Sequence, residues 1–226
     1  MCKPNKMTIV CFGDSITEAA TQMPDENKRW PKLLHDRLMT AFPKTDFQVV
    51  NAGVGGNSAR DAMARFDQDV LAYDPDWIVL EFGGNNDRPE PDLRVEPAEF
   101  TELLNEFRQR LPSKTQVVVM TFPPVIDEQH QYCGKKYYQQ FGGLDASVER
   151  YRSITRDFAA ANSFPLVDFY GELKRRMVLE DPNRYTLPDG IHLTVEGNRL
   201  LAIMISTLLR RLIKPHGSGG QSDAGR

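Results

Sequence analysis

The sequence predicts an α/β protein, a three-layer α/β/α sandwich in which helices cover both faces of a five-stranded parallel sheet. Short runs of β-branched and aromatic residues alternate with helical patterns along the chain of 226 residues. Two of these runs, Ile-Val-Leu at 78–80 and Val-Val-Val at 117–119, are apolar without interruption, as expected of strands covered on both faces. Five successive β-α units favour parallel pairing through right-handed crossovers.

The individual elements are expected in alternation along the chain. Strands are expected where short runs are rich in Val, Ile, Phe and Trp, at 8–12, 47–51, 77–82, 116–121 and 165–168. Helices are expected at the amphipathic segments 30–42, 59–72, 97–111, 144–161 and about 194–213. Pro31 and Pro97 stand where the first turn of a helix tolerates proline. Thr194 is followed three residues later by Gly197 instead of Glu, so the capping box of the last helix is incomplete.

Two segments fall outside this alternation. Residues 122–143 show no regular pattern, and a connection of that length is often functional. If it folds over Ser15, its tyrosines and Phe141 wall a pocket; the alternative is a contact between subunits of a homo-oligomer. Residues 214–226 are rich in Gly and Ser and are expected to form a flexible tail. Residues 1–213 are then expected to form a single domain.

The composition excludes several classes of protein. It is 40% hydrophobic and 26% charged, as in ordinary globular proteins, and the net charge of −3 argues against a nucleic-acid partner. Cys2, Cys11 and Cys133 are odd in number and far apart, which favours neither a disulfide framework nor a Cys-based metal site. No apolar run is long enough for a membrane span or resembles a signal peptide, so a cytoplasmic location is expected.

Four turns fall just past the ends of expected strands, at 13–15, 53–57, 83–87 and 121–124. The carboxyl ends of parallel strands meet at one edge of a sheet, and open α/β sheets bind their ligands beyond that edge. We therefore expect the functional site where these turns converge.

Ser15 lies in the first of these turns, within Gly-Asp-Ser-Ile-Thr. A strand that delivers serine to the start of a helix exposes the hydroxyl beside free backbone N–H groups, as a nucleophile requires. A helix cap is the alternative interpretation, because serine is common at that position. The second Gly of the G-x-S-x-G elbow is absent, so the α/β-hydrolase pattern is not met.

A candidate base lies near the other end of the chain, where His192 follows Asp189 by three residues. A base needs one imidazole nitrogen facing the nucleophile and the other held by an acceptor, which an Asp in the same loop can supply. A turn that precedes the last helix would explain the pair equally well. The other histidines are expected on a helix surface (His35), in the long loop (His130) and in the tail (His216).

The glycine-rich turns at 51–58 and 83–87 allow two interpretations. Their backbone N–H groups suit either a phosphate or an oxyanion, although neither turn is a G-x-G-x-x-G or Walker A sequence. A metal site is a further alternative, but it lacks carboxylate or histidine pairs at ligand spacing. Its candidate ligands are Asp14, Asp87, Asp189 and His192.

Taken together, the four motifs resemble the conserved blocks of the SGNH (GDSL) hydrolases, in the order of that family. They are Gly-Asp-Ser-Ile at 13–16, Asn-Ala-Gly-Val-Gly-Gly-Asn at 51–57, Gly-Gly-Asn at 83–85 and Asp-Gly-Ile-His-Leu-Thr at 189–194. Residues 29–34 resemble the arylesterase-like branch more loosely. The resemblance implies a flavodoxin-like fold and ester hydrolysis without a cofactor.

The resemblance also implies residue roles. Ser15 would be the nucleophile, His192 the base and Asp189 its orienting acid. The oxyanion hole would consist of the N–H groups of Ser15 and Gly56 and the side chain of Asn85. Asn86 fits the motif in a second register, and Asn85 is preferred because it is nearer the sheet edge.

The predicted function is hydrolysis of small-molecule carboxylic esters through an acyl-serine intermediate. Charged residues interrupt every apolar run in 122–143, which favours short acyl groups on acetylated sugars or small alcohols. A lysophospholipase- or thioesterase-like acylhydrolase is one alternative. A non-catalytic α/β module whose glycine loops bind a ligand is the other.

Overall fold

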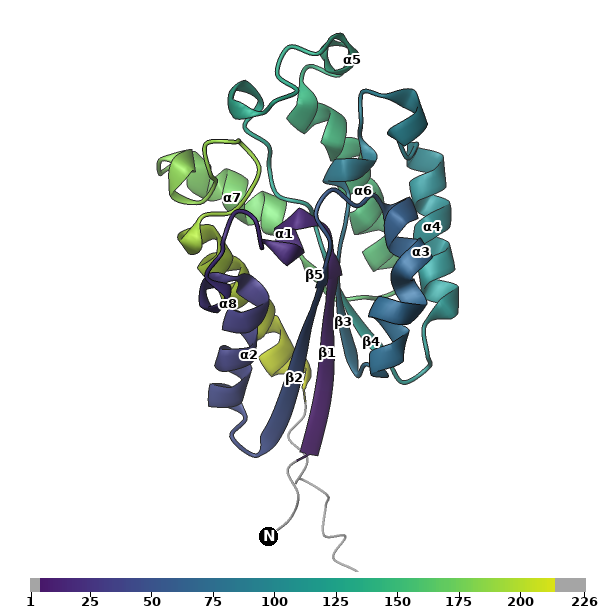
Figure 1. Ribbon diagram of the computed structural model, residues 1–226, viewed down its shortest axis with the longest axis vertical. Helices are drawn as coiled ribbons and strands as arrows, with labels where there is room; N and C mark the ends of the chain where they lie inside the picture. Colours follow the sequence, from purple (N-terminus) through teal and green to yellow (C-terminus); the bar gives the residue numbers. More distant parts are fainter. Residues whose placement is uncertain (1–4, 214–226) are drawn as a thin grey trace, which may run out of the picture.

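The computed structural model describes residues 5–213 and contains a five-stranded parallel sheet in the order β2-β1-β3-β4-β5 (Figure 1). This confirms the expected α/β fold class, and the order is that of flavodoxin-like sheets. The strands are β1 (Asn5–Gly13), β2 (Thr45–Gly53), β3 (Trp77–Glu81), β4 (Gln116–Met120) and β5 (Leu166–Val167).

Helices cover both faces of the sheet (Figure 1). On one face lie α2 (Trp30–Ala41), α7 (Phe169–Met177) and α8 (Val195–Leu212). On the other lie α3 (Ala59–Asp69), α4 (Pro97–Arg110) and α6 (Leu144–Ala161). Two short helices, α1 (Ser15–Glu18) and α5 (Lys136–Gln139), lie beyond the carboxyl ends of the strands.

The uninterrupted apolar strands bury side chains on both faces. In β1, Ile9 and Cys11 belong to the core beneath α2 and α8, whereas Val10 and Phe12 belong to the core beneath α3 and α4. Successive side chains of a strand point to opposite faces, so a strand between two helical layers must be apolar at every position. All four of these side chains are fully or almost fully buried.

The structure differs from the sequence prediction in its short elements. Strand β1 begins three residues before the expected run 8–12 and ends one residue after it. Strand β2 extends two residues beyond the expected run 47–51 at each end. The helices α1, α5 and α7 were not expected, because four to nine residues are too few to display a helical period. The segment 122–143 is not without structure, since it contains α5 and the 3₁₀ turn Asp127–Gln129.

One helix cap was foreseen from the sequence, and another was missed. Thr194 caps α8 by accepting the N–H of Gly197 at 3.2 Å, despite the missing Glu. A complete capping box, which the sequence analysis did not identify, opens α3 at Ser58 and Asp61. The expected tail at 214–226 lies outside the described residues. Within 5–213, no helix is long and apolar enough to cross a membrane.

Candidate active site

Ser15 lies at the carboxyl end of β1, where the chain turns directly into α1 (Figure 1). Asp14 caps this helix by accepting the N–H of Ile16 at 2.9 Å. Gly13 makes the tight entry possible, because a Cβ there would lie 2.1 Å from Thr17 Oγ1. Strand, glycine and cap therefore hold Ser15 half-exposed at the edge of the sheet, as the sequence predicts.

Three side chains from opposite ends of the sequence form a chain of hydrogen bonds at this edge. His192 Nε2 lies 2.9 Å from Ser15 Oγ, and His192 Nδ1 lies 2.7 Å from Asp189 Oδ2. Burial acts to raise the pKa of Asp189, but the N–H groups of His192 and Ile191 and the imidazole outweigh it and hold this pKa below its ordinary value. Asp189 is therefore an ionised acceptor that fixes the ring of His192.

The turn that carries Asp189 and His192 is braced by the neighbouring loop. Gly190 has φ +76°, and a Cβ there would lie 2.5 Å from the carbonyl oxygen of Ile126. The N–H of Ile126 donates to the carbonyl oxygen of Gly190 at 2.8 Å. Glycine is therefore required here both for its backbone conformation and for this close approach.

Asn85 and Asn86 occupy different surroundings in the 3₁₀ turn Gly84–Asn86. Asn85 lines a pocket together with Ser15 and Gly56, and its Nδ2 donates to Asp14 Oδ2 at 3.0 Å. Asn86 is buried, and its Oδ1 accepts the N–H of Ala59 at 2.8 Å. The structure thus places Asn85, and not Asn86, on the pocket that contains Ser15.

Gly56 reaches the same pocket from the loop after β2. Its backbone has φ +78°, and its carbonyl oxygen accepts from Arg88 Nη2 at 2.7 Å. The N–H of the preceding residue, Gly55, donates to Glu18 Oε2 at 2.8 Å. Sequence reasoning missed Glu18 and Arg88, because an isolated charged residue in a turn carries no recognisable signal.

The pocket has a volume of about 330 Å³ and mixes polar and apolar walls. Its polar wall contains Gln22, Arg88, His130 and Gln131, and its apolar wall contains Phe122, Val125, Leu144, Val148 and Ile191. Tyr132 also lines it, so part of the segment 122–143 lies against the site, which is one of the two arrangements that the sequence left open.

Tyr137, Tyr138 and Phe141 of that segment do not line the pocket, although they were expected to do so if the segment folds over Ser15. The hydroxyl of Tyr137 donates to Asp87 Oδ1 at 3.0 Å, and the hydroxyl of Tyr138 donates to the carbonyl oxygen of Asp87 at 2.6 Å. Phe141 packs edge-on against Tyr137 and beneath Arg150. These rings anchor the segment to the turn that carries Asn85. The residues of the segment that line the pocket are Phe122, Val125, His130, Gln131 and Tyr132.

His130 presents a neutral polar group to the pocket. Its Nδ1 accepts the N–H of Tyr132 at 3.2 Å, which places the ring proton on Nε2. Burial lowers the pKa of His130, which also favours the neutral ring. His35 lies on the surface of α2 beside Asp36, as expected, and His216 lies outside the described residues.

Of the four alternative metal ligands, Asp189 and His192 lie side by side, whereas Asp87 and Asp14 are engaged with other partners. Asp87 is held by Arg150 at 3.0 Å and by Tyr137, while both oxygens of Asp14 already accept hydrogen bonds. In the part of the chain that the structure describes, no group of three or more His, Cys, Asp or Glu side chains is arranged to hold a metal ion. Cys11 is buried in the core and Cys133 is exposed.

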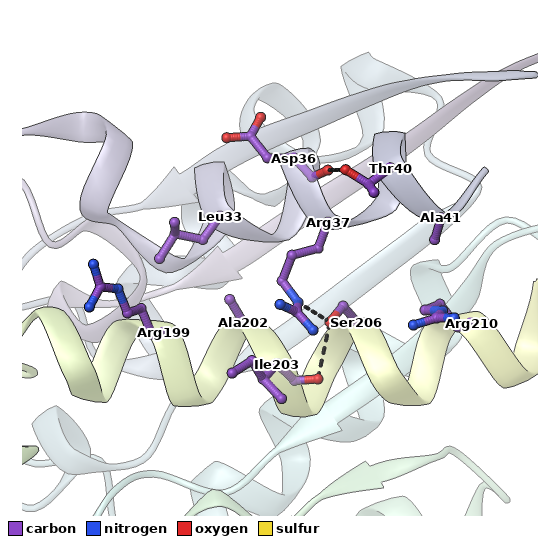
Figure 2. A pocket seen from close by; sticks show the side chains of 10 residues that line it. All are labelled: Leu33, Asp36, Arg37, Thr40, Ala41, Arg199, Ala202, Ile203, Ser206 and Arg210. Atoms are coloured by element: carbon purple, nitrogen blue, oxygen red, sulfur yellow. Dashed lines mark hydrogen bonds between the residues drawn. The ribbon is translucent and has the colours of Figure 1, made fainter. Parts of the chain in front are cut away.

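A larger hollow of about 710 Å³ lies between α2 and α8 (Figure 2). Its serine, Ser206, accepts from Arg37 Nε at 2.7 Å and donates to the carbonyl oxygen of Ile203 at 3.1 Å. No histidine lines this hollow, so its serine has no base. The arrangement suited to nucleophilic chemistry is the one at the carboxyl edge of the sheet.

Comparison with known proteins finds similarity to one family of hydrolases along most of the chain. The model of the GDSL-like lipase/acylhydrolase family matches residues 11–200. An arylesterase of Vibrio mimicus is 35% identical, over 88% of this chain and 86% of its own. The acetylxylan esterase of Geobacillus stearothermophilus is 25% identical, over 72% of this chain and 80% of its own. Thioesterase 1/protease 1/lysophospholipase L1 of Escherichia coli is 26% identical, over 80% and 78%.

Solved structures share the fold. A lipase/acylhydrolase from Enterococcus faecalis superposes with a TM-score of 0.71 at 22% identity, covering 94% of this chain and 100% of its own. An acetylxylan esterase from Geobacillus stearothermophilus superposes with a TM-score of 0.71 at 20% identity, covering 94% and 98%. At these identities the likeness concerns the fold alone.

Proposed function

The chain belongs to the GDSL-like lipase/acylhydrolase family and is an ester hydrolase, and from this premise we propose that it hydrolyses carboxylic esters through an acyl-enzyme intermediate on Ser15. One observation carries the proposal. Ser15, His192 and Asp189 form a continuous chain of hydrogen bonds, at 2.9 and 2.7 Å, beside Asn85 and Gly56.

The geometry supports the following steps. Ser15 Oγ attacks the ester carbonyl while His192 Nε2 accepts its proton, and the carboxylate of Asp189 stabilises the imidazolium that forms. The N–H groups of Ser15 and Gly56 and the Nδ2 of Asn85 donate to the oxyanion. His192 then protonates the leaving alkoxide and later activates the water that releases the acid. No step requires a metal or a cofactor.

The pocket favours a short acyl group and a hydrophilic leaving group. Its volume of about 330 Å³ accommodates a small ester, and Gln22, Arg88 and His130 supply hydrogen bonds to it. Relatives named arylesterase and acetylxylan esterase act on substrates in keeping with this proposal. The apolar wall, together with the thioesterase and lysophospholipase name of the Escherichia coli relative, favours a longer acyl group as the second candidate.

Labelling with a fluorophosphonate probe tests the nucleophile. We expect covalent labelling of the wild-type protein and none of Ser15→Ala. Ser206→Ala is the matched control, because Ser206 lies in a hollow without a histidine, and it should label like the wild type. Labelling that persists in Ser15→Ala would overturn the proposal and leave the ligand-binding alternative.

A further inference from the structure

Two carboxyl groups lie completely buried beneath Ser15. Glu81 is the last residue of β3, Asp14 follows the neighbouring strand β1, and both side chains are 0% exposed. Asp14 behaves as an ionised acceptor, because its Oδ1 accepts the N–H of Ile16 and its Oδ2 accepts from Asn85. A second buried negative charge beside it would be strongly unfavourable.

The surroundings of Glu81 differ at its two oxygens. Oε2 accepts from Thr17 Oγ1 at 3.2 Å and from the N–H of Asp14 at 3.4 Å. Oε1 is buried, and no group among residues 5–213 donates to it. The carboxylate of Asp14 lies within hydrogen-bond reach of Glu81. A proton on the Glu81 carboxyl therefore has an acceptor in Asp14, whereas an ionised Glu81 leaves Oε1 without a donor among the described residues.

Gly13 creates the space in which these groups meet. A Cβ at this position would lie 2.1 Å from Thr17 Oγ1 and 2.8 Å from Glu81 Oε2. Because residue 13 is a glycine, the carboxyl of Glu81 can pack directly against the turn that carries Asp14 and Ser15.

We propose that Glu81 is a positioning residue whose protonated carboxyl donates to Asp14, so that the pair carries a single negative charge and holds Asn85 beside Ser15. This rests on the proposed function, in which Asn85 binds the oxyanion. Burial raises the pKa of Glu81 well above its ordinary value, with the charge of Asp14 as the next cause, and burial raises the pKa of Asp14 to about 6. The proton therefore remains on Glu81 at neutral pH.

The charge of the pair matters because Asn85 has two amide hydrogens. One is held by Asp14, which leaves the other for the oxyanion. Two negative charges beneath the turn would oppose the oxyanion as it forms, while a fully neutral pair would hold Asn85 less firmly. Another charged group acts on Asp14, because against the larger effect of burial the charge of His192 lowers its pKa. Arg65 on α3 donates from Nη2 to the carbonyl oxygen of Gly13, the residue before Asp14, at 2.9 Å.

Two substitutions separate a protonated Glu81 from an ionised one. Glu81→Gln reproduces the protonated acid, because its amide donates to Asp14 while its oxygen accepts from Thr17. We expect its kcat to stay within roughly threefold of the wild type. Glu81→Leu removes both hydrogen bonds, and we expect kcat to fall roughly 10- to 100-fold with KM little changed. A folded Glu81→Gln variant as impaired as Glu81→Leu would overturn the proposal.

Infrared spectroscopy of the resting protein reads the proton directly and does not depend on activity. We expect the carbonyl stretch of a protonated carboxylic acid at pH 7, lost in Glu81→Gln. Glu172→Gln is the matched control: Arg175, the larger cause, lowers the pKa of Glu172, so this group is ionised and its substitution should leave the band unchanged. A wild-type spectrum without the band, or a band that survives Glu81→Gln, would contradict the proposal.

The two proposals fail in different ways. If Ser15→Ala retains full ester hydrolysis, the proposed function fails, whereas the infrared band still reports the protonation of Glu81. If Ser15→Ala is inactive and the band is absent, only the role of Glu81 fails. Should Glu81→Leu not fold, Glu81→Gln and the infrared measurement decide the question.

Discussion

At the scale of single residues, Asn85 and Asn86 show how adjacent identical side chains acquire different surroundings. The first lines the same pocket as Ser15 and donates to Asp14, and the second is buried against the start of α3. Both registers fit the sequence motif, and only the fold of the turn distinguishes them. The preference for Asn85 as the oxyanion donor stays a prediction.

Substituting each asparagine tests this distinction. Asn85→Ala should lower kcat roughly 10²- to 10³-fold with little change in KM, as for the loss of one oxyanion donor. Asn86→Ala leaves the buried N–H of Ala59 without its acceptor, so it should lower the free energy of unfolding by about 1–3 kcal/mol and affect kcat much less. Steady-state kinetics and urea unfolding of both variants provide the measurement. The reverse pattern would assign the oxyanion to Asn86.

Asp14 makes stability depend on pH. Its pKa of about 6 in the folded protein exceeds the value of 3.8 expected for the unfolded chain. The folded state therefore binds the proton more tightly, and stability from this group is present below pH 4 and lost as the pH rises through about 6. The unfolding free energy of the wild type relative to Asp14→Asn should fall by roughly 2–3 kcal/mol between pH 4 and pH 7. Urea titrations at both pH values measure it, and a relative stability that rises with pH would contradict this prediction.

At the scale of elements, the segment between β4 and α6 is fixed to the site at two places. Tyr137 and Tyr138 attach it to Asp87, and the backbone at Ile126 pairs with Gly190 in the turn that carries the candidate base. From its length, sequence reasoning singled out the segment as a candidate for a functional role, with a subunit contact as the alternative. It could not identify which side chains face the pocket, because that depends on the turn at 127–129 and on α5.

Gly190→Ala tests the contact between these two loops. The substitution places a Cβ 2.5 Å from the carbonyl oxygen of Ile126 in a backbone with φ +76°. We expect a loss of roughly 2–4 kcal/mol in unfolding free energy and a marked fall in kcat, because His192 would be displaced. Gly142→Ala is the matched control: φ is +86° but no atom lies within 4 Å of the added Cβ, so it should cost about 1 kcal/mol and leave kcat unchanged. Equal effects of the two substitutions would show that the contact has no role.

The mixed wall of the pocket predicts a preference for short acyl chains. Each further methylene contributes about 0.8 kcal/mol only where an apolar surface receives it, and Gln22, Arg88 and His130 limit that surface here. Rates on p-nitrophenyl acetate, butyrate, octanoate and laurate should therefore be highest for acetate or butyrate. A maximum at octanoate or laurate would favour the thioesterase- or lysophospholipase-like alternative.

At the scale of the whole molecule, the parallel sheet brings the parts of the site together. Ser15 follows β1, Gly56 follows β2 and Asn85 follows β3, while Asp189 and His192 precede α8. Because the strands run in one direction, turns that are far apart in sequence open at one edge. Strand periodicity was sufficient to predict this convergence, along with the five long helices.

Other features of the molecule could not be predicted from the sequence. Glu81 continues an apolar strand, and only the neighbouring turn at Asp14 reveals that it is buried beside a second carboxyl. Arg88 and Glu18 hold the loop at Gly55 and Gly56 through backbone atoms, so their partners carry no side-chain signature. Long-range polar contacts of this kind depend on tertiary packing, whereas strands and amphipathic helices depend on local patterns.

The acyl-enzyme on Ser15 is the central claim, and trapping it is the most direct test. Acid quenching during turnover of p-nitrophenyl acetate, followed by peptide mass spectrometry, should find acetate esterified to the peptide that contains Ser15. Ser15→Ala should carry no acetyl group there and should lose ester hydrolysis, while its fold remains intact by circular dichroism. Hydrolysis at the wild-type rate by Ser15→Ala, or an acetyl group that accumulates on a different residue, would contradict the account.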